Sequence, residues 1–409
     1  MNHEEEIKHE NLCLLVVAGG QGTRLWPISN PDCPKQFTKL NEDDTFIQNT
    51  VKRFYDFGVL PQNLYVAVTN KRQREHVIEQ LRGLAIRQVN ILEYPPTLGY
   101  AGCMAKANEY IRIQNRDAVV INTPSDQFVN MSGESRENFM KTMELATLTA
   151  QNHKPTMVGV KVSDMVTCRG CGHALYDLRD QSAAKRVTGF VEKPKSDKYV
   201  REMLRAGNTA CNTGINVWHV DDLHAAIQGI DLDQRELGTD ELMGLFTDLR
   251  VAIGEFEWKD CGTLKSLYDI SAKDPTTGNA TLGHGDYYVQ STDCEGCFFY
   301  TIEGIDLYVT GFKDASIVVN WFNDKLYFAV VHHKYCQEVR NLVEFFSQNS
   351  DVLTNDYSIF GRNNMIAMTN FSDNVCGGFV GFDNVHVFAT KITKKGEKNV
   401  ILQVSQQAA

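Results

Sequence analysis

The chain has 409 residues, of which 43% are hydrophobic, and its formal net charge at pH 7 is −10. This length and composition exclude a disordered chain and a small disulfide-stapled domain, and they predict two or three domains of roughly 100 to 200 residues each. The negative balance argues against a nucleic-acid partner held by bulk positive charge, and favours small anionic ligands in a local pocket.

The amino-terminal segment Met1–Asn11 is charged and lacks the apolar run of a signal peptide. No later stretch approaches the ~18 consecutive apolar residues of a membrane span. These features predict a soluble, cytoplasmic protein with no membrane partner. The eleven cysteines, an odd number in a large chain, then fit reduced thiols better than a disulfide framework.

Short β-branched runs alternate with amphipathic stretches from Leu12 to about Phe256, which is typical of a parallel sheet with helices on both faces. The predicted strands are Leu12–Val17, Leu64–Thr69, Val89–Leu92, Ala118–Asn122, Met157–Val160, Val187–Val191 and Ile215–Val220. The predicted helices are Phe46–Phe57, Arg72–Leu81, Gly102–Ile113, Arg136–Gln151 and Tyr199–Ala206. Because ligands of such sheets bind beyond the carboxyl ends of the strands, polar residues that follow a strand are candidate site residues.

Past Lys273 the pattern changes to closely spaced β segments separated by Gly and Asp, followed by a helical pattern over Tyr335–Phe346. These segments are Cys297–Ile302, Asp306–Thr310, Ile317–Val319 and Lys325–Val331. No repeat at a fixed solenoid period is evident. We therefore predict a first domain over 1–272, a β-rich domain with a closing helix over 273–346, and an extension over 347–409. The extension could be a dimer element, an added strand pair or a partner site, and the sequence leaves open whether the chain forms a homo-oligomer.

The first predicted strand runs directly into a glycine-rich segment, Ala18-Gly19-Gly20-Gln21-Gly22-Thr23. Glycines allow positive φ and bring backbone N–H groups close to an anion without side-chain obstruction, so the segment predicts a phosphate cradle. Its spacing matches neither the dinucleotide-binding motif nor the P-loop. Two cations, Arg24 and Lys35, follow in the sequence, and such groups neutralise the oxygens of a polyphosphate under attack.

The extended string from Ala18 to Pro27, continued by Pro34-Lys35-Gln36-Phe37, resembles the sugar-nucleotide pyrophosphorylase (nucleotidyltransferase) family. Within that family it is most similar to the mannose-1-phosphate guanylyltransferases, or GDP-mannose pyrophosphorylases, and the resemblance extends from about Leu12 to Phe346. It implies an α/β fold of the Rossmann-like (GT-A) type, with a mixed, mostly parallel sheet flanked by helices and a smaller β-rich carboxyl-terminal domain. The implied reaction is attack of a sugar phosphate oxygen on the α-phosphorus of a nucleoside triphosphate, which releases pyrophosphate. GTP and mannose 1-phosphate, giving GDP-mannose, are the first candidates.

Two aspartates resemble the metal-binding pair of this family. Asp126 follows the predicted strand Ala118–Asn122, and Asp260 lies at another strand-to-helix junction. Mg²⁺ prefers one or two carboxylates together with phosphate oxygens and water. Since the nucleophile is already an anion, positioning and charge neutralisation replace an activated Ser or Cys. The resemblance thus implies Mg²⁺ as cofactor, Asp126 and Asp260 as its ligands, and Arg24, Lys35 and Asp126 as catalytic residues. An isolated aspartate at either place would be an N-cap or turn residue.

The sugar-binding residues are implied by three segments of the same resemblance. In Phe190-Val191-Glu192-Lys193-Pro194, Glu192 corresponds to a ligand of sugar hydroxyls and Lys193 to a ligand of the sugar phosphate. Asn212 falls in the sugar-contacting Asn-Ser/Thr-Gly motif. Gly170 lies where relatives have Tyr-Gly-Tyr beside the sugar, but its neighbours differ here, so the hexose could differ from mannose.

The nucleotide-binding residues implied by the resemblance are Ala18, Gly19, Gly20, Gly22, Thr23, Gly99 and Gly102. The turn Leu98–Gly102 departs from the Arg-Asn-Thr-Ala-Pro of bacterial guanylyltransferases and resembles eukaryotic-type relatives or thymidylyltransferases. The base is therefore less firmly predicted than the reaction, and a transferase for another base or sugar 1-phosphate stays an alternative. A non-catalytic, nucleotide-sugar-binding regulatory subunit is a second alternative, although such subunits usually lose residues that this chain retains.

Two cysteine pairs form a third candidate site. Cys168 and Cys171 with His173, together with Cys294 and Cys297, could bind zinc tetrahedrally. The separation of the pairs far exceeds the ~15 to 20 residues of a compact zinc ribbon. Reduced thiols are therefore the favoured interpretation.

Overall fold

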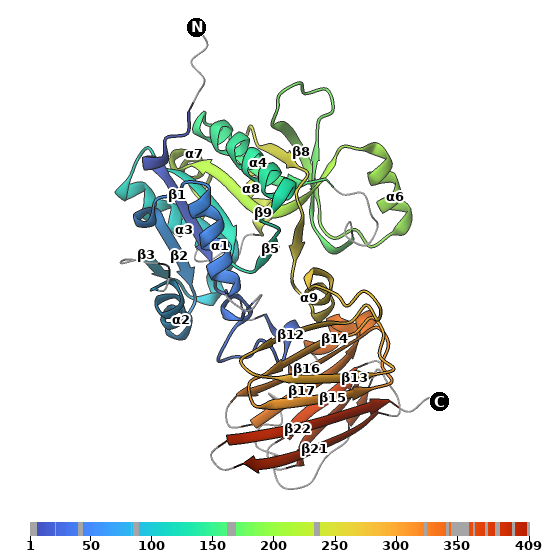
Figure 1. Ribbon diagram of the computed structural model, residues 1–409. Helices are drawn as coiled ribbons and strands as arrows, with labels where there is room; N and C mark the ends of the chain where they lie inside the picture. The colour runs from blue at the N-terminus through green and yellow to red at the C-terminus, as the bar shows by residue number, and fades with distance from the viewer. Residues whose placement is uncertain are drawn as a thin grey trace. The chain divides into compact units, whose positions relative to one another are not determined.

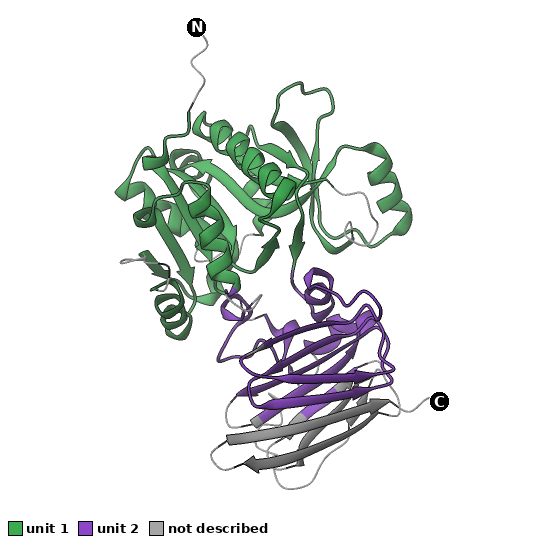
Figure 2. Ribbon diagram, viewed as in Figure 1, with its two compact units in different colours: residues 1–19, 46–260 green, residues 20–45, 261–409 purple. Residues whose placement is uncertain are grey.

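The chain forms two compact units in a computed structural model (Figure 2). The residues that the structure describes are 6–20, 22–39, 44–82, 84, 90–161, 169–232, 238–322, 325–340, 343–344, 360–362, 365–372, 375–380, 385–394 and 397–406. The first unit contains Met1–Gly19 and Phe46–Asp260, and the second contains Gly20–Thr45 and Cys261–Ala409. The sequence predicts contiguous domains, whereas the second unit also includes the segment that follows the first glycines.

A nine-stranded sheet forms the centre of the first unit, in the order β3-β2-β1-β4-β9-β6-β10-β8-β7 (Figure 1). Its strands are β1 (Leu12–Val17), β2 (Leu64–Val68), β3 (Asn90–Glu93), β4 (Val119–Pro124), β6 (Thr156–Val160), β7 (His173–Tyr176), β8 (Lys185–Val191), β9 (Thr209–His219) and β10 (Arg250–Gly254). Strands β8 and β9 run opposite to the other seven, so the sheet is mixed, as predicted. Each of the seven predicted runs overlaps one of these strands, while β7 and β10 were not predicted.

Helices cover both faces of this sheet because its central strands are apolar on both sides. Every residue of β1 is buried, as expected for a parallel strand with two covered faces. Leu15 and its alternate neighbours join the core under α3, and the intervening residues face the opposite side. Figure 1 shows α1 and α4 in front of the sheet. The helices are α1 (Phe46–Asp56), α2 (Lys71–Arg82), α3 (Gly99–Gln114), α4 (Gly133–Gln151), α6 (Asp197–Ala206), α7 (Val220–Ala226) and α8 (Thr239–Met243).

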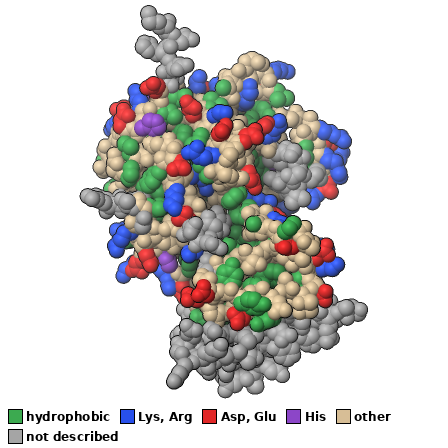
Figure 3. Space-filling model, in the orientation of Figure 1, with side chains coloured by type: hydrophobic (Ala, Val, Ile, Leu, Met, Phe, Trp, Pro, Cys, Tyr) green, Lys and Arg blue, Asp and Glu red, His purple; other side chains and the backbone are tan. Residues whose placement is uncertain are grey.

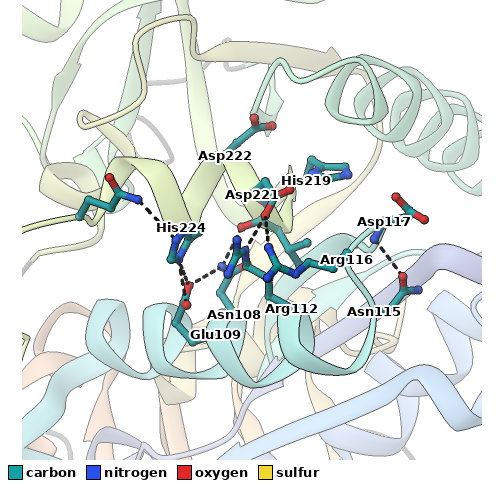
Figure 4. Close-up of polar contacts among 12 residues, drawn as sticks. Asn108, Glu109, Arg112, Asn115, Arg116, Asp117, His219, Asp221, Asp222 and His224 are labelled. Carbon is teal, nitrogen blue, oxygen red and sulfur yellow. Dashed lines mark hydrogen bonds and ion pairs between the residues drawn. The ribbon is translucent and has the colours of Figure 1, made fainter.

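A cluster of polar side chains joins α3 to α7 and to the end of β9 (Figure 4). The indole Nε1 of Trp218 donates to Oδ1 of Asn108 at 2.8 Å, and both side chains are buried. Arg112 on α3 forms an ion pair with Asp221 on α7. These contacts satisfy polar groups that would otherwise be costly beneath the helices, and they make α3 and α7 one layer.

The second unit contains two sheets of seven and four strands, in the orders β12-β14-β16-β17-β20-β19-β18 and β13-β15-β22-β21. The strands that precede the carboxyl-terminal extension are β12 (Ala280–His284), β13 (Tyr288–Thr292), β14 (Phe298–Ile302), β15 (Ile305–Thr310), β16 (Ala315–Phe322) and β17 (Lys325–His332), and helix α9 (Leu264–Ile270) comes before them. Inward side chains from both sheets, among them Phe299, Leu307 and Ile317, form one apolar core. The β-rich prediction for this region is confirmed.

These strands repeat with a period that the sequence analysis missed. Parallel pairing joins Ala280 to Phe298 and Phe298 to Ser316, eighteen residues further along each time. Positive φ recurs at the same interval, at Gly278 (68°), Gly296 (65°) and Asp314 (48°). The prediction of no fixed period was therefore wrong. Many paired residues, such as Ala280 and Phe298, differ in identity, so the period is chiefly a repeat of conformation.

The carboxyl-terminal extension adds strands to both sheets of the second unit. Its strands are β18 (Phe360–Arg362), β19 (Met365–Ser372), β20 (Val375–Val380), β21 (Val385–Lys394) and β22 (Glu397–Gln406). Strand β20 pairs in parallel with β17, and β22 pairs in parallel with β15. The helix predicted over Tyr335–Phe346 begins as a 3₁₀ helix, η6 (His333–Glu338), and several of its later positions lie outside the described residues.

Charged side chains of both signs are interspersed on the face drawn in Figure 3. None of the helices in the described part of the chain combines the length and the apolar character needed to cross a membrane. The cytoplasmic location stays a prediction from the sequence.

Candidate active site

The glycine-rich segment begins in the first unit, where β1 ends. The backbone N–H of Ala18 donates to the carbonyl of Ala67 at 2.8 Å, which continues the pairing of β1 with β2. A Cβ at position 19 would lie 2.5 Å from Cγ2 of Thr69, and Nε2 of Gln73 donates to the Gly19 carbonyl at 3.2 Å. The close approach of the β2 end therefore requires glycine at position 19.

The remainder of the segment belongs to the second unit, where it packs on the motif that contains Lys35. Gly22 has φ of 66° and precedes the short helix η2 (Thr23–Leu25), which includes Thr23 and Arg24. A Cβ at position 22 would overlap Cβ of Lys35, and Nε2 of Gln36 donates to the Gly20 carbonyl at 2.9 Å. The structure thus brings the two halves of the predicted motif together. Lys35 is buried, and Nη1 of Arg24 donates to Oε1 of Gln337 at 3.0 Å.

A cavity of about 460 Å³ in the first unit collects most of the other predicted residues. Gly170, Glu192, Lys193, Asn212 and Asp260 all line it. The remaining lining residues, for which the sequence predicted no nucleotide or sugar contact, are Tyr100, Pro124, Gln127, Cys171, Gly172, Gly214, Gly238, Thr239, Asp240, Glu241 and Trp258. Its volume suits a small ligand such as a sugar phosphate.

Glu192 and Lys193 lie at the end of β8 in a strained and closely packed conformation. Nζ of Lys193 lies 3.1 Å from Oε1 of Glu192, so the pair places a cation and an acceptor side by side. Lys193 has φ of 36°, which a non-glycine residue rarely adopts and which is common at functional sites. Oε2 of Glu192 would lie 2.5 Å from a Cβ at position 172, so Gly172 makes room for this carboxylate.

Asn212 is fixed on β9 opposite the segment that contains Gly172. Its backbone N–H donates to the Gly172 carbonyl at 2.8 Å. Its Oδ1 accepts from the N–H of Gly214 at 2.8 Å, and Gly214 has the positive φ of 75° that this turn requires. These bonds hold the Asn212 side chain at the cavity wall.

The prediction of reduced thiols was wrong for one pair. Cys171 and Cys211 are joined by a disulfide, with their Cα atoms 6.1 Å apart. The β7–β9 register, which pairs His173 with Cys211, brings Cys171 within reach although 40 residues separate the pair in sequence. Of the other cysteines proposed for zinc, Cys168 lies outside the described residues. Within the described part of the chain, no group of three or more His, Cys, Asp and Glu side chains could hold a metal ion.

A small two-stranded sheet links the segment that contains Asp126 to the strand that ends at Asp260. Strand β5 (Gln127–Val129) pairs with β11 (Trp258–Asp260), and the register places Asp260 opposite Gln127. Asp126 directly precedes Gln127 in the chain, so the register brings the backbone of Asp126 near that of Asp260. Two carboxylates without a third protein ligand fit a cation such as Mg²⁺ that draws its other ligands from substrate and water.

Tyr100, at the start of α3, lies close to this acidic pair. Its hydroxyl donates to Oδ1 of Asn122 at 3.2 Å, and Nδ2 of Asn122 donates to the Leu15 carbonyl. Burial raises the pKa of Tyr100, and the negative charge of Asp126 raises it further. The phenol therefore stays protonated and donates its hydrogen bond. Gly99, with φ of 67°, and Gly102, whose Cβ would lie 2.6 Å from Cγ of Leu98, shape the turn around it.

Asp240 is an acidic residue of the cavity that the sequence analysis missed. Burial raises its pKa, the negative charge of Glu192 raises it further, and Lys193 opposes the shift. Asp240 therefore lies within electrostatic range of both predicted sugar-binding residues. The sequence signal was the string Gly238-Thr239-Asp240-Glu241, in which Glu241 accepts from the N–H of Gly238 at 2.9 Å and caps the short helix α8.

The chain belongs to the nucleotidyl transferase family, whose sequence pattern matches residues 14–277. It is similar to the alginate biosynthesis protein AlgA of Pseudomonas aeruginosa, with 27% identity over 359 residues that cover 81% of this chain and 71% of that protein. It is also similar to a mannose-1-phosphate guanylyltransferase of Salmonella montevideo, with 27% identity over 345 residues that cover 75% of this chain and 70% of the relative. The solved structure of a mannose-1-phosphate geranyltransferase from Thermus thermophilus shares the fold, with a TM-score of 0.65 and 24% identity over 82% of this chain and 99% of the other.

Proposed function

We propose that this protein transfers GMP from GTP to mannose 1-phosphate, producing GDP-mannose and pyrophosphate. The observation that carries the proposal is the cavity in which Glu192, Lys193 and Asn212 converge beside Asp260. A sugar phosphate has hydroxyls at one end and an anion at the other. The cavity wall offers hydrogen-bond acceptors for the hydroxyls and a cation for the phosphate. The names of relatives matched over most of the chain support the choice of GTP and mannose 1-phosphate.

Each residue of the cavity has a role in this proposal. The Lys193 ammonium holds the sugar phosphate, Glu192 accepts hydrogen bonds from the sugar hydroxyls, and Asn212 supplies an amide beside them. Gly170 lines the same wall without a side chain. Because the phosphate oxygen is already nucleophilic, its orientation toward the α-phosphorus is the main contribution that these residues make.

Asp126 and Asp260 are the proposed ligands of Mg²⁺. The pairing of Asp260 with Gln127, the residue after Asp126, supports this assignment, and the number of carboxylates suits the cation. When bound, Mg²⁺ would neutralise negative charge on the reacting phosphate oxygens.

The triphosphate is assigned to the motif that spans Ala18 to Lys35. The backbone of Ala18, Gly19, Gly20, Gly22 and Thr23 would bind the phosphates, and Arg24 and Lys35 would neutralise them. The packing of Gly22 against Lys35 supports a single functional segment. Gly99 and Gly102 are proposed to border the base. The parallel order β3-β2-β1-β4, with the glycines directly after β1, supports a Rossmann-like (GT-A-type) description of this unit.

A matrix of nucleoside triphosphates against sugar 1-phosphates, read as pyrophosphate release with Mg²⁺, tests the proposal. GTP with mannose 1-phosphate is expected to give the highest kcat/KM. A preference for another base or hexose would revise the substrates and keep the reaction class. An absence of sugar-dependent pyrophosphate release across the whole matrix would contradict the proposal.

A further inference from the structure

Arg53 is a buried arginine that contacts the backbone next to Asp126, one of the proposed cation ligands. It lies on α1 with only 3% of its surface exposed, and its guanidinium carbon is 5.9 Å from the centre of the Phe139 ring. A guanidinium stays protonated in proteins, and a buried charge is costly unless it is hydrogen-bonded or faces opposite charge. A position that retains such a group therefore calls for a specific explanation.

The hydrogen bonds of α1 bracket Asp126. Nη2 of Arg53 donates to the carbonyl of Gln127 at 3.2 Å. One helical turn earlier, the Thr50 hydroxyl lies 3.5 Å from the carbonyl of Ser125, a longer contact. The backbone on each side of Asp126 is thus attached to the same face of α1.

Gln127 connects the Arg53 contact to the second aspartate. Gln127 accepts from Arg53 and pairs with Asp260 in the β5–β11 ladder. The guanidinium therefore contacts the one residue that lies next to Asp126 in the chain and opposite Asp260 in the sheet. Two carboxylates that bind one cation repel each other when the cation is absent, and a fixed positive charge nearby offsets that repulsion.

We propose that Arg53 is a positioning residue for the divalent cation: it holds the segment Ser125–Gln127, which contains Asp126 and pairs through Gln127 with Asp260, and its charge favours the ionised form of both carboxylates. This inference rests on the proposed function insofar as Asp126 and Asp260 are taken as ligands of the cation. It assigns Arg53 no contact with substrate. Residues that orient metal ligands without touching the metal commonly change metal affinity by roughly 10- to 100-fold when replaced.

A purely structural role for Arg53 predicts a different result. Packing on Phe139 and a bond to a carbonyl would contribute to stability, and their loss would lower the melting temperature alone. Cation affinity measured on the folded protein separates the two roles. Arg112 provides the matched control, because it is a partly buried arginine of the same unit whose ion pair with Asp221 is structural (Figure 4).

The experiment measures Mn²⁺ binding to the full chain by electron paramagnetic resonance, together with the Mg²⁺ concentration for half-maximal turnover and the melting temperature. Arg53→Met is expected to weaken Mn²⁺ binding by roughly 10- to 100-fold and to raise the Mg²⁺ requirement in proportion. Arg53→Lys, which keeps the charge, is expected to recover most of the affinity. Arg112→Met is expected to lower the melting temperature and leave Mn²⁺ affinity unchanged.

Wild-type Mn²⁺ affinity in folded Arg53→Met would overturn the inference. If Arg53→Met fails to fold, Arg53→Gln decides, since it removes the charge and keeps a donor for the Gln127 carbonyl; wild-type affinity in that variant likewise overturns the inference. Failure of the proposed function gives a separate result: wild-type protein that binds Mn²⁺ in an Arg53-dependent way and releases no pyrophosphate with any substrate pair.

Discussion

Residues with positive φ occur in different settings in the two units. In the first unit, two residues with positive φ, Lys193 (36°) and Gly214 (75°), line the cavity. In the second unit, positive φ recurs every eighteen residues, at Gly278, Gly296 and Asp314. Each of these residues lies just before a strand of the seven-stranded sheet, β12, β14 or β16. Positive φ at a non-glycine residue beside a cavity, as at Lys193, therefore points to a functional constraint, whereas positive φ at a fixed interval indicates repeated architecture.

A sequence motif need not lie within one unit of the fold. The predicted triphosphate segment crosses from one unit to the other, because Ala18 and Gly19 belong to the first and Gly20 onward to the second. The second unit is thus more than a carboxyl-terminal appendage of the chain. Substitutions in the cavity of the first unit should change turnover, and comparable substitutions in the β-rich part of the second unit should change only stability.

The largest expected effect is at the acidic pair of the first unit. Asp126→Asn should lower Mg²⁺-dependent turnover by about 10³-fold or more, because it removes one of two carboxylates proposed for a cation that contributes several kcal/mol. The measurement is pyrophosphate release. Asp306→Asn, on β15 of the second unit, should leave turnover unchanged. Undiminished pyrophosphate release by Asp126→Asn would contradict the assignment of Asp126 as a cation ligand.

A smaller effect is expected from a methyl group in the cavity wall. Gly172→Ala places a Cβ 2.5 Å from Oε2 of Glu192, the far end of a flexible side chain, so the carboxylate should move while the fold persists. KM for mannose 1-phosphate should rise about tenfold, the equivalent of one lost hydrogen bond to a charged group. Gly189→Ala on β8, whose nearest neighbour would be 3.9 Å away, is the control. An equal KM in both variants would show that Glu192 does not bind the sugar.

In the second unit the expected effect is on stability instead. Gly296→Ala puts an alanine at a φ of 65° and its Cβ 2.8 Å from Oδ1 of Asp314. The unfolding free energy should fall by about 1 to 2 kcal/mol, with turnover per folded molecule unchanged. Asp314→Gly, at the next equivalent position, should be neutral or slightly stabilising. Urea unfolding measures both, and equal destabilisation by the two variants would contradict the conformational period.

The smallest expected effect is a pH dependence of stability in the second unit. Burial, helped by Lys265, lowers the pKa of His333 to about 4. The unfolded chain then binds more protons than the folded chain between about pH 6.5 and 4, so the His333 contribution is complete above that window and is lost as the pH falls through it. His333→Phe should remove on the order of 1 kcal/mol of this acid sensitivity, after allowance for partial exposure. Urea unfolding of both proteins at about pH 7.5 and about pH 5 tests the prediction, which fails if their acid sensitivities match.

Local patterns predicted the strands and helices of the first unit well. A strand such as Leu12–Val17 is covered on both faces, and its sequence is therefore a continuous apolar run. Glu192 and Lys193 were found instead through the family resemblance of the segment Phe190–Pro194. Tyr100, Gly172 and Asp240 were missed because the register of distant strands and a short capped helix bring them to the cavity. The disulfide and the period of eighteen depend on the same kind of long-range pairing, which no local window contains.

The central claim is that the cavity of the first unit binds the phosphate of mannose 1-phosphate through Lys193. The direct test compares kcat/KM for mannose 1-phosphate, at saturating GTP and Mg²⁺, among wild-type protein, Lys193→Met and Lys195→Met, whose side chain is an exposed neighbour. We expect a loss of roughly 10- to 100-fold for Lys193→Met alone, since the variant removes a charged hydrogen bond to an anion. Equal values for the two variants would contradict it.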